Sequence, residues 1–346
     1  MAYTTIDKST DYFNTKLYTG TGSSQVITGV GFSPDFIWTK TRNEAEIHCL
    51  NTTVQGINNY LRSNDIDQLE TGGSNITAQS SDGYTVGTTD RFNQSSNTFV
   101  SWNWKANGAG ASNEDGSINT IKTSVSTTSG FSISTYTGTG SAATIGHGLG
   151  VAPTAIWIKK TSATEQWFCW NQGLTAAGGF IKLDTSGATS TNDTAFPWNP
   201  QANTFGVSTD AATNASGVTY IAYCFAEKQG FSKMNSYLGN GSTNGSFIYT
   251  GFSPAVVIMK NVTNASTPWL IWDNKRPGYN VTNLRLRPNT VDAEDTSTAD
   301  PVDLLSNGFK CRGINDDSNK AGSTFIYLAF AEEPFVTSTG IPATAR

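Results

Sequence analysis

The chain has 346 residues, a formal net charge of −5 and charged side chains at only 14% of positions. Because Lys and Arg are few and scattered, the sequence offers no basic field for DNA or RNA, and we expect no nucleic-acid partner. An aromatic content of 11% is too high for a disordered chain. Short apolar runs separated by Gly, Ser, Thr and Asn are typical of an all-β protein with many turns.

No segment has the pattern of a signal peptide or the roughly 20 apolar residues that a membrane-spanning helix needs. We therefore expect a protein that is made in a cytoplasm and does not insert into a membrane. Each cysteine lies in an apolar, strand-like context, so we expect buried free thiols rather than disulfides or a metal site. These cysteines are Cys49, Cys169, Cys224 and Cys311.

The first third of the chain contains five landmarks in order. The pentapeptide YTGTG (Tyr18–Gly22) is followed by an apolar strand at Pro34–Lys40 and a second strand at Glu46–Asn51. A turn with Tyr84 then leads to a closing strand that begins at Phe99. YTGTG lacks the third glycine of a dinucleotide fingerprint and the GK[ST] of a P-loop, so we interpret it as a hairpin turn rather than a phosphate site.

The same landmarks recur twice, which predicts three tandem repeats of one β-domain. The tyrosine of the glycine turn precedes the proline by 16, 17 and 17 residues, and the proline precedes the lysine by six residues each time. The second set is Tyr136–Gly140 (YTGTG), Pro153–Lys159, Trp167–Asn171, Phe205 and a closing strand from Tyr220; the third is Tyr237–Gly241 (YLGNG), Pro254–Lys260, Trp269–Asn274, Phe309 and a closing strand from Phe325.

We place the repeats at residues 1–108, 109–229 and 230–336, with an extended C-terminal tail at 337–346. A Gly/Ser/Asn-rich linker at Asn107–Ser117 marks the first boundary. Each repeat has about 100 residues, which is enough to bury a core of its own, and contains about six to eight short strands. The expected fold is all-β, with three tandem copies of an antiparallel β-sandwich or jelly-roll-like domain.

The closing strand of the second repeat is apolar on both faces, which predicts burial between two layers. One face carries Ile221, Tyr223 and Phe225, and the other carries Tyr220, Ala222, Cys224 and Ala226. No amphipathic helix of useful length is evident in the chain.

The two histidines do not indicate a catalytic or metal site. His48 and His147 lie in different repeats about 100 residues apart, which argues against a Ser-His-Asp triad or a histidine-bearing zinc site. The alignment of the repeats places Phe168 and Leu270 at the position of His48, on an apolar strand.

The acidic residues are equally uninformative. Glu227 and Glu332 end equivalent strands, and we find no pair of carboxylates arranged for glycoside hydrolysis. The acid-rich stretch Val291–Asp303 is interpreted as a solvated loop, with a calcium or other cation site as the alternative, although EF-hand spacing is missing. We therefore predict no enzyme activity, no catalytic residue, no metal site and no cofactor.

The nine tryptophans provide the best functional signal. Trp38 and Trp157 share one repeat position, which Ile258 occupies in the third repeat, so we expect them in the core. Trp198 (in FPWNP) and Tyr279 (in RPGYN) have no counterpart in the other repeats, which makes them candidate ligand-binding residues that stack on a sugar or a partner protein. Loop anchors folded down onto the protein are the alternative.

The motifs TTIDKSTDYFNTKLYTGTG, GFSPDFIWTKTRN, SDGYTVG and FVSWNWKANG resemble repeat domains in virion proteins of marine tailed bacteriophages. Many of these are T7-like phages of cyanobacteria and other ocean bacteria, and the products are usually labelled tail fibre or virion structural protein. The stretch GFSISTYTGTGSAATIGHGLGVAPTAIWIKK resembles a second type of repeat in that family. The resemblance extends through Phe335. It brings no catalytic residues and implies a component of the particle surface.

From this resemblance we expect a non-enzymatic bacteriophage virion structural protein, made in the host bacterial cytoplasm and located in the virion. Tail-fibre or other tail-associated host adsorption is the leading interpretation, and capsid decoration that stabilises the shell is the first alternative, since no coiled coil or long shaft is evident. A polysaccharide depolymerase is the second alternative. The expected partners are other virion proteins and a host cell-surface glycan, and the oligomeric options are a homotrimer or pseudo-threefold contacts within one chain.

Overall fold

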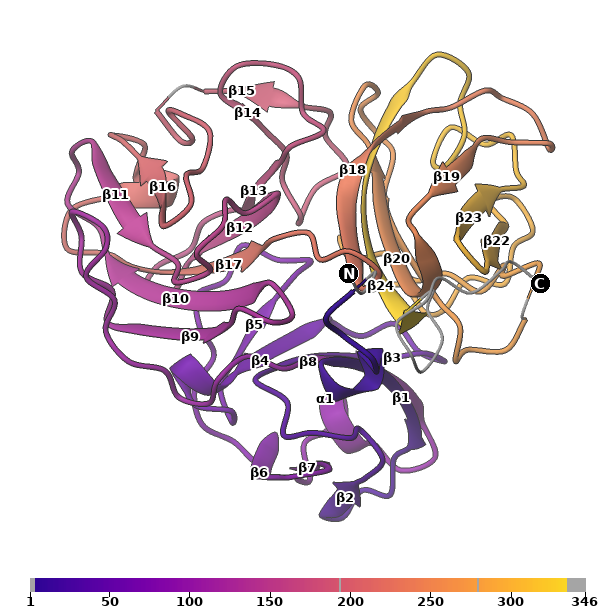
Figure 1. Ribbon diagram of the computed structural model, residues 1–346. Helices are drawn as coiled ribbons and strands as arrows, with labels where there is room; N and C mark the ends of the chain where they lie inside the picture. Colours follow the sequence, from indigo (N-terminus) through magenta and orange to yellow (C-terminus); the bar gives the residue numbers. More distant parts are fainter. Residues whose placement is uncertain (1–3, 193, 279, 335–346) are drawn as a thin grey trace.

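The computed structural model describes residues 4–192, 194–278 and 280–334, which form three β-lobes around a common centre (Figure 1). The sheets are antiparallel, and the two α-helices of the described residues have four residues each: α1 (Asp90–Asn93) and α2 (Ala211–Asn214). Two 3-10 turns, η1 (Ser9–Asp11) and η2 (Thr53–Gln55), lie in the first lobe. The all-β prediction is confirmed. None of these helices is long or apolar enough to cross a membrane.

Lobe 1 contains a large sheet of order β1-β8-β3-β4-β5 and a small sheet of order β2-β7-β6. Its strands are β1 (Phe13–Thr19), β2 (Gln25–Ile27), β3 (Phe36–Thr41), β4 (Cys49–Thr52), β5 (Tyr60–Arg62), β6 (Ile76–Ser80), β7 (Gly83–Val86) and β8 (Thr98–Trp104).

Lobe 2 contains a large sheet of order β13-β12-β17-β10-β9 and two two-stranded sheets, β11-β16 and β14-β15. Its strands are β9 (Lys122–Ser126), β10 (Phe131–Thr137), β11 (Ala143–Gly146), β12 (Ala155–Lys160), β13 (Phe168–Asn171), β14 (Gly179–Phe180), β15 (Ser190–Thr191), β16 (Thr204–Val207) and β17 (Thr219–Phe225).

Lobe 3 contains a sheet of order β18-β24-β20-β21 and a small sheet of order β19-β23-β22. Its strands are β18 (Ser232–Leu238), β19 (Phe247–Tyr249), β20 (Phe252–Asn261), β21 (Trp269–Asp273), β22 (Val302–Leu305), β23 (Gly308–Cys311) and β24 (Thr324–Pro334).

One strand order occurs in all three lobes: β1-β8-β3-β4, β10-β17-β12-β13 and β18-β24-β20-β21. In each case the closing strand lies between the strand that precedes the glycine turn and the strand that ends in lysine. This recurrence agrees with the spacing of the sequence landmarks. The division into three separate domains stays a prediction, because the lobes share much of their core.

The YTGTG segments are turns, but not hairpin turns. Strand β1 pairs with β8 whereas β2 pairs with β7, so the segment at Tyr18–Gly22 carries the chain from one sheet to the other. Gly20 is required there, because a Cβ atom on it would lie 2.2 Å from the carbonyl oxygen of Gln94. The turn then closes on the end of α1, where the Gly22 N–H donates to the Asn93 carbonyl at 2.7 Å.

A buried asparagine side chain completes this turn in every lobe. In lobe 2 the Asn214 side-chain oxygen accepts from the Thr139 N–H at 2.8 Å, and its Nδ2 donates to the carbonyls of Ser141 and Ser208 at 2.6 and 2.7 Å. Asn93 and Asn319 make the same set of contacts in lobes 1 and 3. All three asparagines are fully buried.

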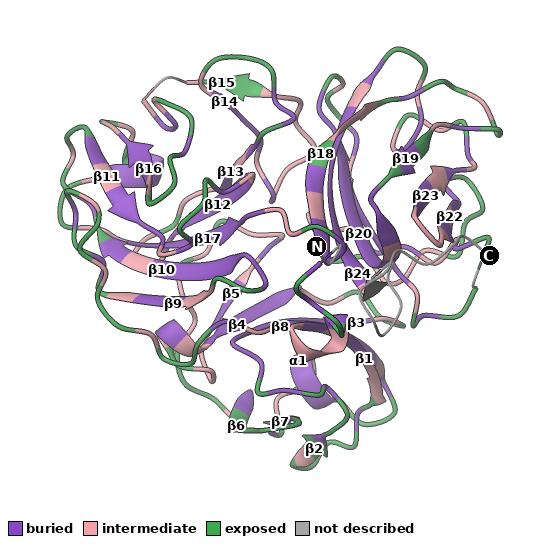
Figure 2. Ribbon diagram, in the orientation of Figure 1, coloured by how far each residue is buried: buried purple, intermediate pink, exposed green. Residues whose placement is uncertain are grey.

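The closing strands separate two layers of core, as the alternation in β17 predicts. Ile221, Tyr223 and Phe225 face the central cluster of the molecule. Tyr220, Ala222, Cys224 and Ala226 belong to a second cluster that is confined to lobe 2. The large sheets of all three lobes meet at the central cluster, where buried residues are concentrated (Figure 2).

Aromatic side chains from three lobes form the centre. Trp38 of lobe 1 lies edge-on to Trp157 of lobe 2, with ring centroids 6.0 Å apart, and Phe330 of lobe 3 contacts both Trp104 and Phe225. Trp38 and Trp157 are therefore core residues, as predicted. The expectation that each repeat buries a core of its own describes only part of the arrangement, because the inner face of each large sheet is covered by the other lobes.

The lobes also form a closed ring of backbone hydrogen bonds. Between lobes 1 and 2, the Leu69 N–H donates to the Thr161 carbonyl (3.0 Å). Between lobes 2 and 3, the Thr189 N–H donates to the Val262 carbonyl (2.9 Å). Between lobes 3 and 1, the Glu294 N–H donates to the Arg42 carbonyl (2.6 Å). The acceptors each lie two residues after the lysine landmark, so the three contacts are equivalent. A head-to-tail contact that closes after three units produces a pseudo-threefold ring within one chain.

Candidate functional site

A cavity of about 750 Å³ opens beside Trp198 in lobe 2. This volume falls in the range of small-ligand sites. Three segments form its wall: the chain before β12, the end of β13 with the loop that follows, and the loop before β16. The lining residues are Ala152, Pro153, Thr154, Trp170, Gln172, Leu174, Thr175, Ala176, Ala177, Gly178, Phe196, Pro197, Trp198, Asn199 and Pro200.

Trp198 combines a fixed position with an accessible surface. Its side chain is 41% exposed, yet a Cβ atom on Gly206 would lie 2.2–2.5 Å from three adjacent atoms of the indole. Because the three distances are nearly equal, the glycine lies against the face of the ring. Pro197 and Pro200 restrict the backbone on either side, and the buried Phe196 anchors the loop.

The cavity arises where lobe 2 departs from the other two lobes. The equivalents of β16 are β7 and β23, and each has a third strand on its outer side, β6 or β22. In lobe 2 a loop takes the place of this third strand, and hydrogen bonds join it to β16 near both ends of β16. Gln201 N–H donates to Thr204 O (2.8 Å), and Ser208 N–H donates to Thr194 O (3.1 Å). Trp198 packs between them.

The register of the small sheets shows that Gly206 stands where the other two lobes have a residue with a longer side chain. It follows the aromatic landmark Phe205 in β16, and the equivalent positions after Tyr84 and Phe309 are Thr85 and Lys310. Either of those side chains would collide with the indole. The sequence therefore replaces a strand and a side chain with a loop, an exposed tryptophan and a glycine.

Among the residues that the structure describes, the lining of the cavity contains no charged side chain. Its polar groups come from Thr154, Gln172, Thr175 and Asn199. The Gln172 side chain is held in place because its Nε2 donates to Glu227 Oε1 at 2.8 Å and to the Met234 carbonyl. Burial raises the pKa of Glu227 from its ordinary value.

Of the two candidate residues from the sequence, the structure places Trp198 at this cavity. Tyr279 lies outside the described residues, so its candidacy stays a prediction. The other lining residues were missed because their role depends on how three segments meet. Gly206 carried the available signal, since it interrupts a strand position that has a side chain in the other repeats.

A family model described as a domain of unknown function, DUF7483, matches residues 8–334. The chain belongs to the DUF7483 family. No curated protein matches the chain. A single DUF7483 match covers all three lobes, so the unit that the family describes is the whole ring rather than one lobe. Within this DUF7483 unit the cavity at Trp198 belongs to lobe 2 alone.

The alignment of His48 with the other repeats is corrected by strand register. Trp38 pairs with Leu50, Trp157 with Cys169 and Ile258 with Ile271. His48 therefore corresponds to Trp167 and Trp269, not to Phe168 and Leu270. The error came from aligning Cys49 with Cys169, which are one position apart in the repeat.

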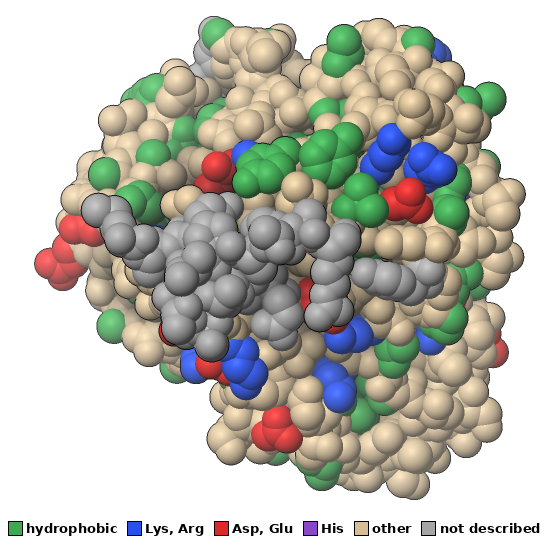
Figure 3. All heavy atoms as spheres, turned by 45° about the vertical axis from the view of Figure 1, so that its right-hand side comes forward, with side chains coloured by type: hydrophobic (Ala, Val, Ile, Leu, Met, Phe, Trp, Pro, Cys, Tyr) green, Lys and Arg blue, Asp and Glu red, His purple; other side chains and the backbone are tan. Residues whose placement is uncertain are grey.

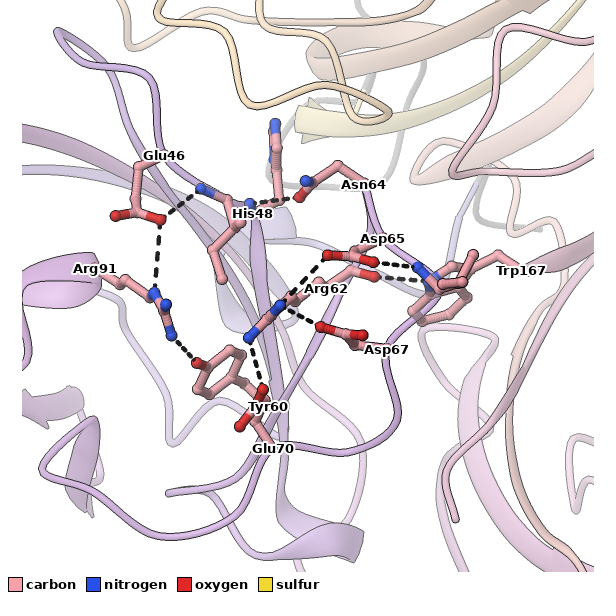
Figure 4. A network of polar contacts seen from close by, with 12 residues as sticks. Glu46, His48, Tyr60, Arg62, Asn64, Asp65, Asp67, Glu70, Arg91 and Trp167 are labelled. Atoms are coloured by element: carbon pink, nitrogen blue, oxygen red, sulfur yellow. Dashed lines mark hydrogen bonds and ion pairs between the residues drawn. The ribbon is translucent and has the colours of Figure 1, made fainter. Parts of the chain in front are cut away.

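This corrected position is a contact between lobes (Figure 4). The Trp167 Nε1 of lobe 2 donates to the Arg62 carbonyl of lobe 1 at 2.7 Å, and the Trp269 Nε1 of lobe 3 donates to the Lys182 carbonyl of lobe 2 at 2.9 Å. At the contact between lobes 1 and 3, His48 of lobe 1 lies near the backbone of Arg287 in lobe 3. The buried His48 Nε2 has no hydrogen bond of normal geometry among the described residues.

The environment of His48 keeps its ring neutral. The Trp38 indole N–H donates to His48 Nδ1 at 2.9 Å, which places the ring hydrogen of the neutral form on Nε2. Burial lowers the pKa of His48 well below its ordinary value, the nearby Lys40 and Arg276 lower it further, and the Arg287 backbone opposes them.

Arg62 fixes the segment of lobe 1 that reaches lobe 2. Its guanidinium forms ion pairs with Asp65, Asp67 and Glu70, the last at 2.6 Å (Figure 4). The same segment contributes the Ile66 carbonyl, which accepts from the Glu165 N–H and from Lys159 Nζ of lobe 2. These carboxylates therefore hold, through Arg62, the loop that contacts lobe 2.

The acid-rich stretch Val291–Asp303 is the expected solvated loop only in part: Asp292 and residues 296–299 are exposed, whereas other acidic side chains of the stretch are held within the protein. Glu294 bridges Arg42 of lobe 1 and Arg276 of lobe 3, and its side chain is only 10% exposed. Asp300 is buried and pairs with Arg285. Arginines thus neutralise these carboxylates, and no cluster of three or more His, Cys, Asp or Glu suitable for a metal exists among the described residues.

Three equivalent lysines are buried at the ends of β3, β12 and β20. Burial lowers the pKa of Lys40 and Lys159 to about 8 and that of Lys260 to about 7. Their ammonium groups donate mainly to backbone carbonyls, as in the contact of Lys260 Nζ with the Asn261 carbonyl at 2.7 Å. They lie outside the cavity, and the four cysteines are buried free thiols, as predicted.

Proposed function

We propose that this protein is a non-enzymatic structural protein on the surface of a tailed bacteriophage particle, mounted on the tail and acting in adsorption to the host. The resemblance of the repeat motifs to marine phage virion proteins supports the kind of particle. The observation that carries the adsorption role is Trp198, a partly exposed aromatic side chain held over Gly206 at a cavity whose described lining residues are uncharged.

The rest of the molecule suits a scaffold for such a contact. The surface seen in Figure 3 is mostly neutral, with scattered hydrophobic and charged side chains. The lobes are joined by a closed ring and a shared aromatic core, so a loop on lobe 2 is supported by the whole molecule. Binding groups on loops held by a rigid scaffold are common in recognition proteins.

Capsid decoration is the second candidate, and the closed ring favours it. A pseudo-threefold monomer matches the symmetry of a local threefold axis, where three equivalent lobes could contact three identical neighbours. In that case the expected partners are major capsid proteins, and the Trp198 cavity would contact one of them.

Location and copy number in the particle test these alternatives. Immunogold labelling of purified virions should place the protein on the tail, and quantitative mass spectrometry should give on the order of a dozen copies. On the order of hundreds of copies on the head would support decoration and exclude the tail role. Absence from purified particles would exclude both.

A polysaccharide depolymerase would release reducing ends from host polysaccharide. We expect no release above a heat-inactivated control, in keeping with a non-enzymatic role. Sustained product formation that depends on the folded protein would contradict this part of the proposal.

A further inference from the structure

We propose that the cavity beside Trp198 binds an uncharged sugar residue of a glycan, which stacks on the indole. The inference rests on the proposed adsorption function and names the ligand class of the same site. It follows from three features of the described residues: the accessible indole, the composition of the cavity wall and the fixed polar groups around it.

The indole provides a flat apolar platform. One face packs on Gly206, so its position does not depend on a ligand, while 41% of the side chain is accessible. The face of a pyranose ring that carries C–H groups is apolar and of similar width, and such contacts bury area without moving the protein. Pro197 and Pro200 reduce the loop entropy that binding would otherwise cost.

The wall favours hydroxyl groups over charges. The described residues of the lining include no Lys, Arg, Asp or Glu, so a carboxylate or sulfate on the sugar would lose hydration with no partner of opposite charge among them. The Glu227 carboxyl, which holds Gln172 from outside the lining, and the net charge of −5 further disfavour an anion. Sugar hydroxyls instead need donors and acceptors.

Gln172 is prepared for that role. Its amide N–H groups donate to Glu227 and to the Met234 carbonyl, which leaves its carbonyl oxygen to accept a hydrogen bond from a ligand hydroxyl. The exposed Thr175 lies in the same segment of the wall as Gln172, and the exposed Asn199 lies in the loop before β16. A cavity with one aromatic platform and several polar groups of this kind provides orientation as well as affinity.

Binding of defined oligosaccharides tests the inference. The probes are maltohexaose, cellohexaose, laminarihexaose and chitohexaose as neutral ligands, with oligogalacturonate and oligoalginate as anionic comparators. Isothermal titration and quenching of tryptophan fluorescence on the full chain should detect at least one neutral ligand. The anionic comparators should bind at least about tenfold more weakly.

Two variants test the geometry independently. Trp198→Ala removes the platform and should weaken the bound neutral ligand about tenfold or more, whereas Trp198→Phe should retain most of the affinity. Gly206→Ala keeps the tryptophan but forces the indole away from β16, and should produce a similar loss. Phe247→Ala, at an aromatic side chain of lobe 3 that is 47% exposed, is the matched control and should bind as the unmodified protein does.

Failure to bind any neutral probe, a preference for the anionic probes, or unchanged affinity in both Trp198→Ala and Gly206→Ala would overturn the inference. These outcomes are separable from the proposed function. If the protein is present on the phage tail but binds no sugar, the proposed function stands and the inference fails. If it binds sugar but is absent from virions, the inference stands and the proposed function fails.

Discussion

At the scale of single residues, one buried amide closes the glycine turn of each lobe. The Asn214 side chain uses its oxygen and both hydrogens, so its amide cannot be replaced by a group of the same shape but different polarity. The same is true of Asn93 and Asn319. The glycines attracted attention in the sequence, but the asparagines that hold them lie some 75 residues later in each repeat.

Asn214→Asp tests this closure. The carboxylate would place an oxygen against the carbonyls of Ser141 and Ser208, where the amide now donates, and we expect the free energy of unfolding to fall by about 3 kcal/mol. Chemical denaturation measures the loss. Asn203→Asp, at an exposed asparagine of the same lobe, is the control and should change stability by less than about 0.5 kcal/mol. A loss below about 1 kcal/mol in Asn214→Asp would contradict the role of the amide.

His48 predicts acid sensitivity. Because its pKa in the folded protein lies well below the ordinary 6.5, the unfolded chain binds more protons below pH 6.5, and the contribution of His48 to stability is lost as the pH falls. His48→Gln removes the titrating group and can keep an acceptor for Trp38. Its free energy of unfolding should therefore decline less steeply between pH 6.5 and 5 than that of the unmodified protein.

The comparison of the two slopes is needed because other groups act in the opposite sense. Burial raises the pKa of Asp184 to about 6 and also raises those of Asp35, Glu227 and Asp317, so these carboxyls favour the folded state as the pH falls. They are present in both proteins and cancel in the difference. Parallel slopes would show that His48 is not the sensor.

At the scale of elements, the repeat of strands could be predicted from the sequence, whereas its variations could not. Prolines, lysines and closing strands recur at nearly constant spacing, because every lobe needs the same four-stranded order. The burial of β17 on two faces followed from its alternation. The cavity did not, since it depends on the contact between Trp198 and Gly206, where a loop in one lobe replaces a strand present in the others.

The hairpin interpretation failed for a related reason. A glycine turn after a strand is compatible with a return along the same sheet or a passage to another, and only tertiary packing decides between them. In this fold the neighbour of β1 is β8, nearly the whole lobe later in the chain. The one-residue error in the alignment of His48 had a local cause. Matching Cys49 with Cys169 overrode the spacing from the lysine landmark, which places these two cysteines one position apart in the repeat.

The buried lysines at the ends of β3, β12 and β20 predict that the free energy of unfolding rises with pH. The pKa of Lys260 is about 7 in the folded protein and 10.5 as an ordinary value, so above pH 7 the unfolded chain holds the additional proton. Lys40 and Lys159 act in the same direction from about pH 8. We expect the free energy of unfolding to increase between pH 7 and 8.5.

Lys260→Met isolates one lysine. Full release of one proton on folding corresponds to about 1.4 kcal/mol per pH unit, so the variant should show a slope smaller by up to about that amount. Denaturation at pH 7, 7.5, 8 and 8.5 covers the window. It ends below the ordinary thiol pKa of 9.0, above which the buried cysteines would oppose the lysines. Equal slopes in the two proteins would exclude the mechanism.

At the scale of the whole molecule, Glu294 closes the ring between lobe 3 and lobe 1. Glu294→Ala would leave Arg42 and the fully buried Arg276 without this partner, and we expect a loss of about 3–5 kcal/mol in the free energy of unfolding. Glu332→Ala removes a partner of Lys275 from a partly exposed ion pair and should cost less than about 1 kcal/mol. Similar effects of the two substitutions in chemical denaturation would argue against ring closure as a source of stability.

The shared core predicts that the lobes do not fold alone. Phe330 packs on Trp104 of lobe 1 and Phe225 of lobe 2, so a chain that ends at residue 229 would expose the inner faces of two sheets. We expect the fragments 1–229 and 230–346, prepared separately, to bind ANS and to lack a near-ultraviolet circular dichroism signal, as loosely packed states do. Mixed during refolding, they should recover both the signal and a single cooperative unfolding transition, because the ring and the core contacts between them need no covalent link. If fragment 230–346 alone unfolds cooperatively with a native near-ultraviolet spectrum, then lobe 3 is an independent domain, and the ring is an assembly of finished domains rather than one folding unit.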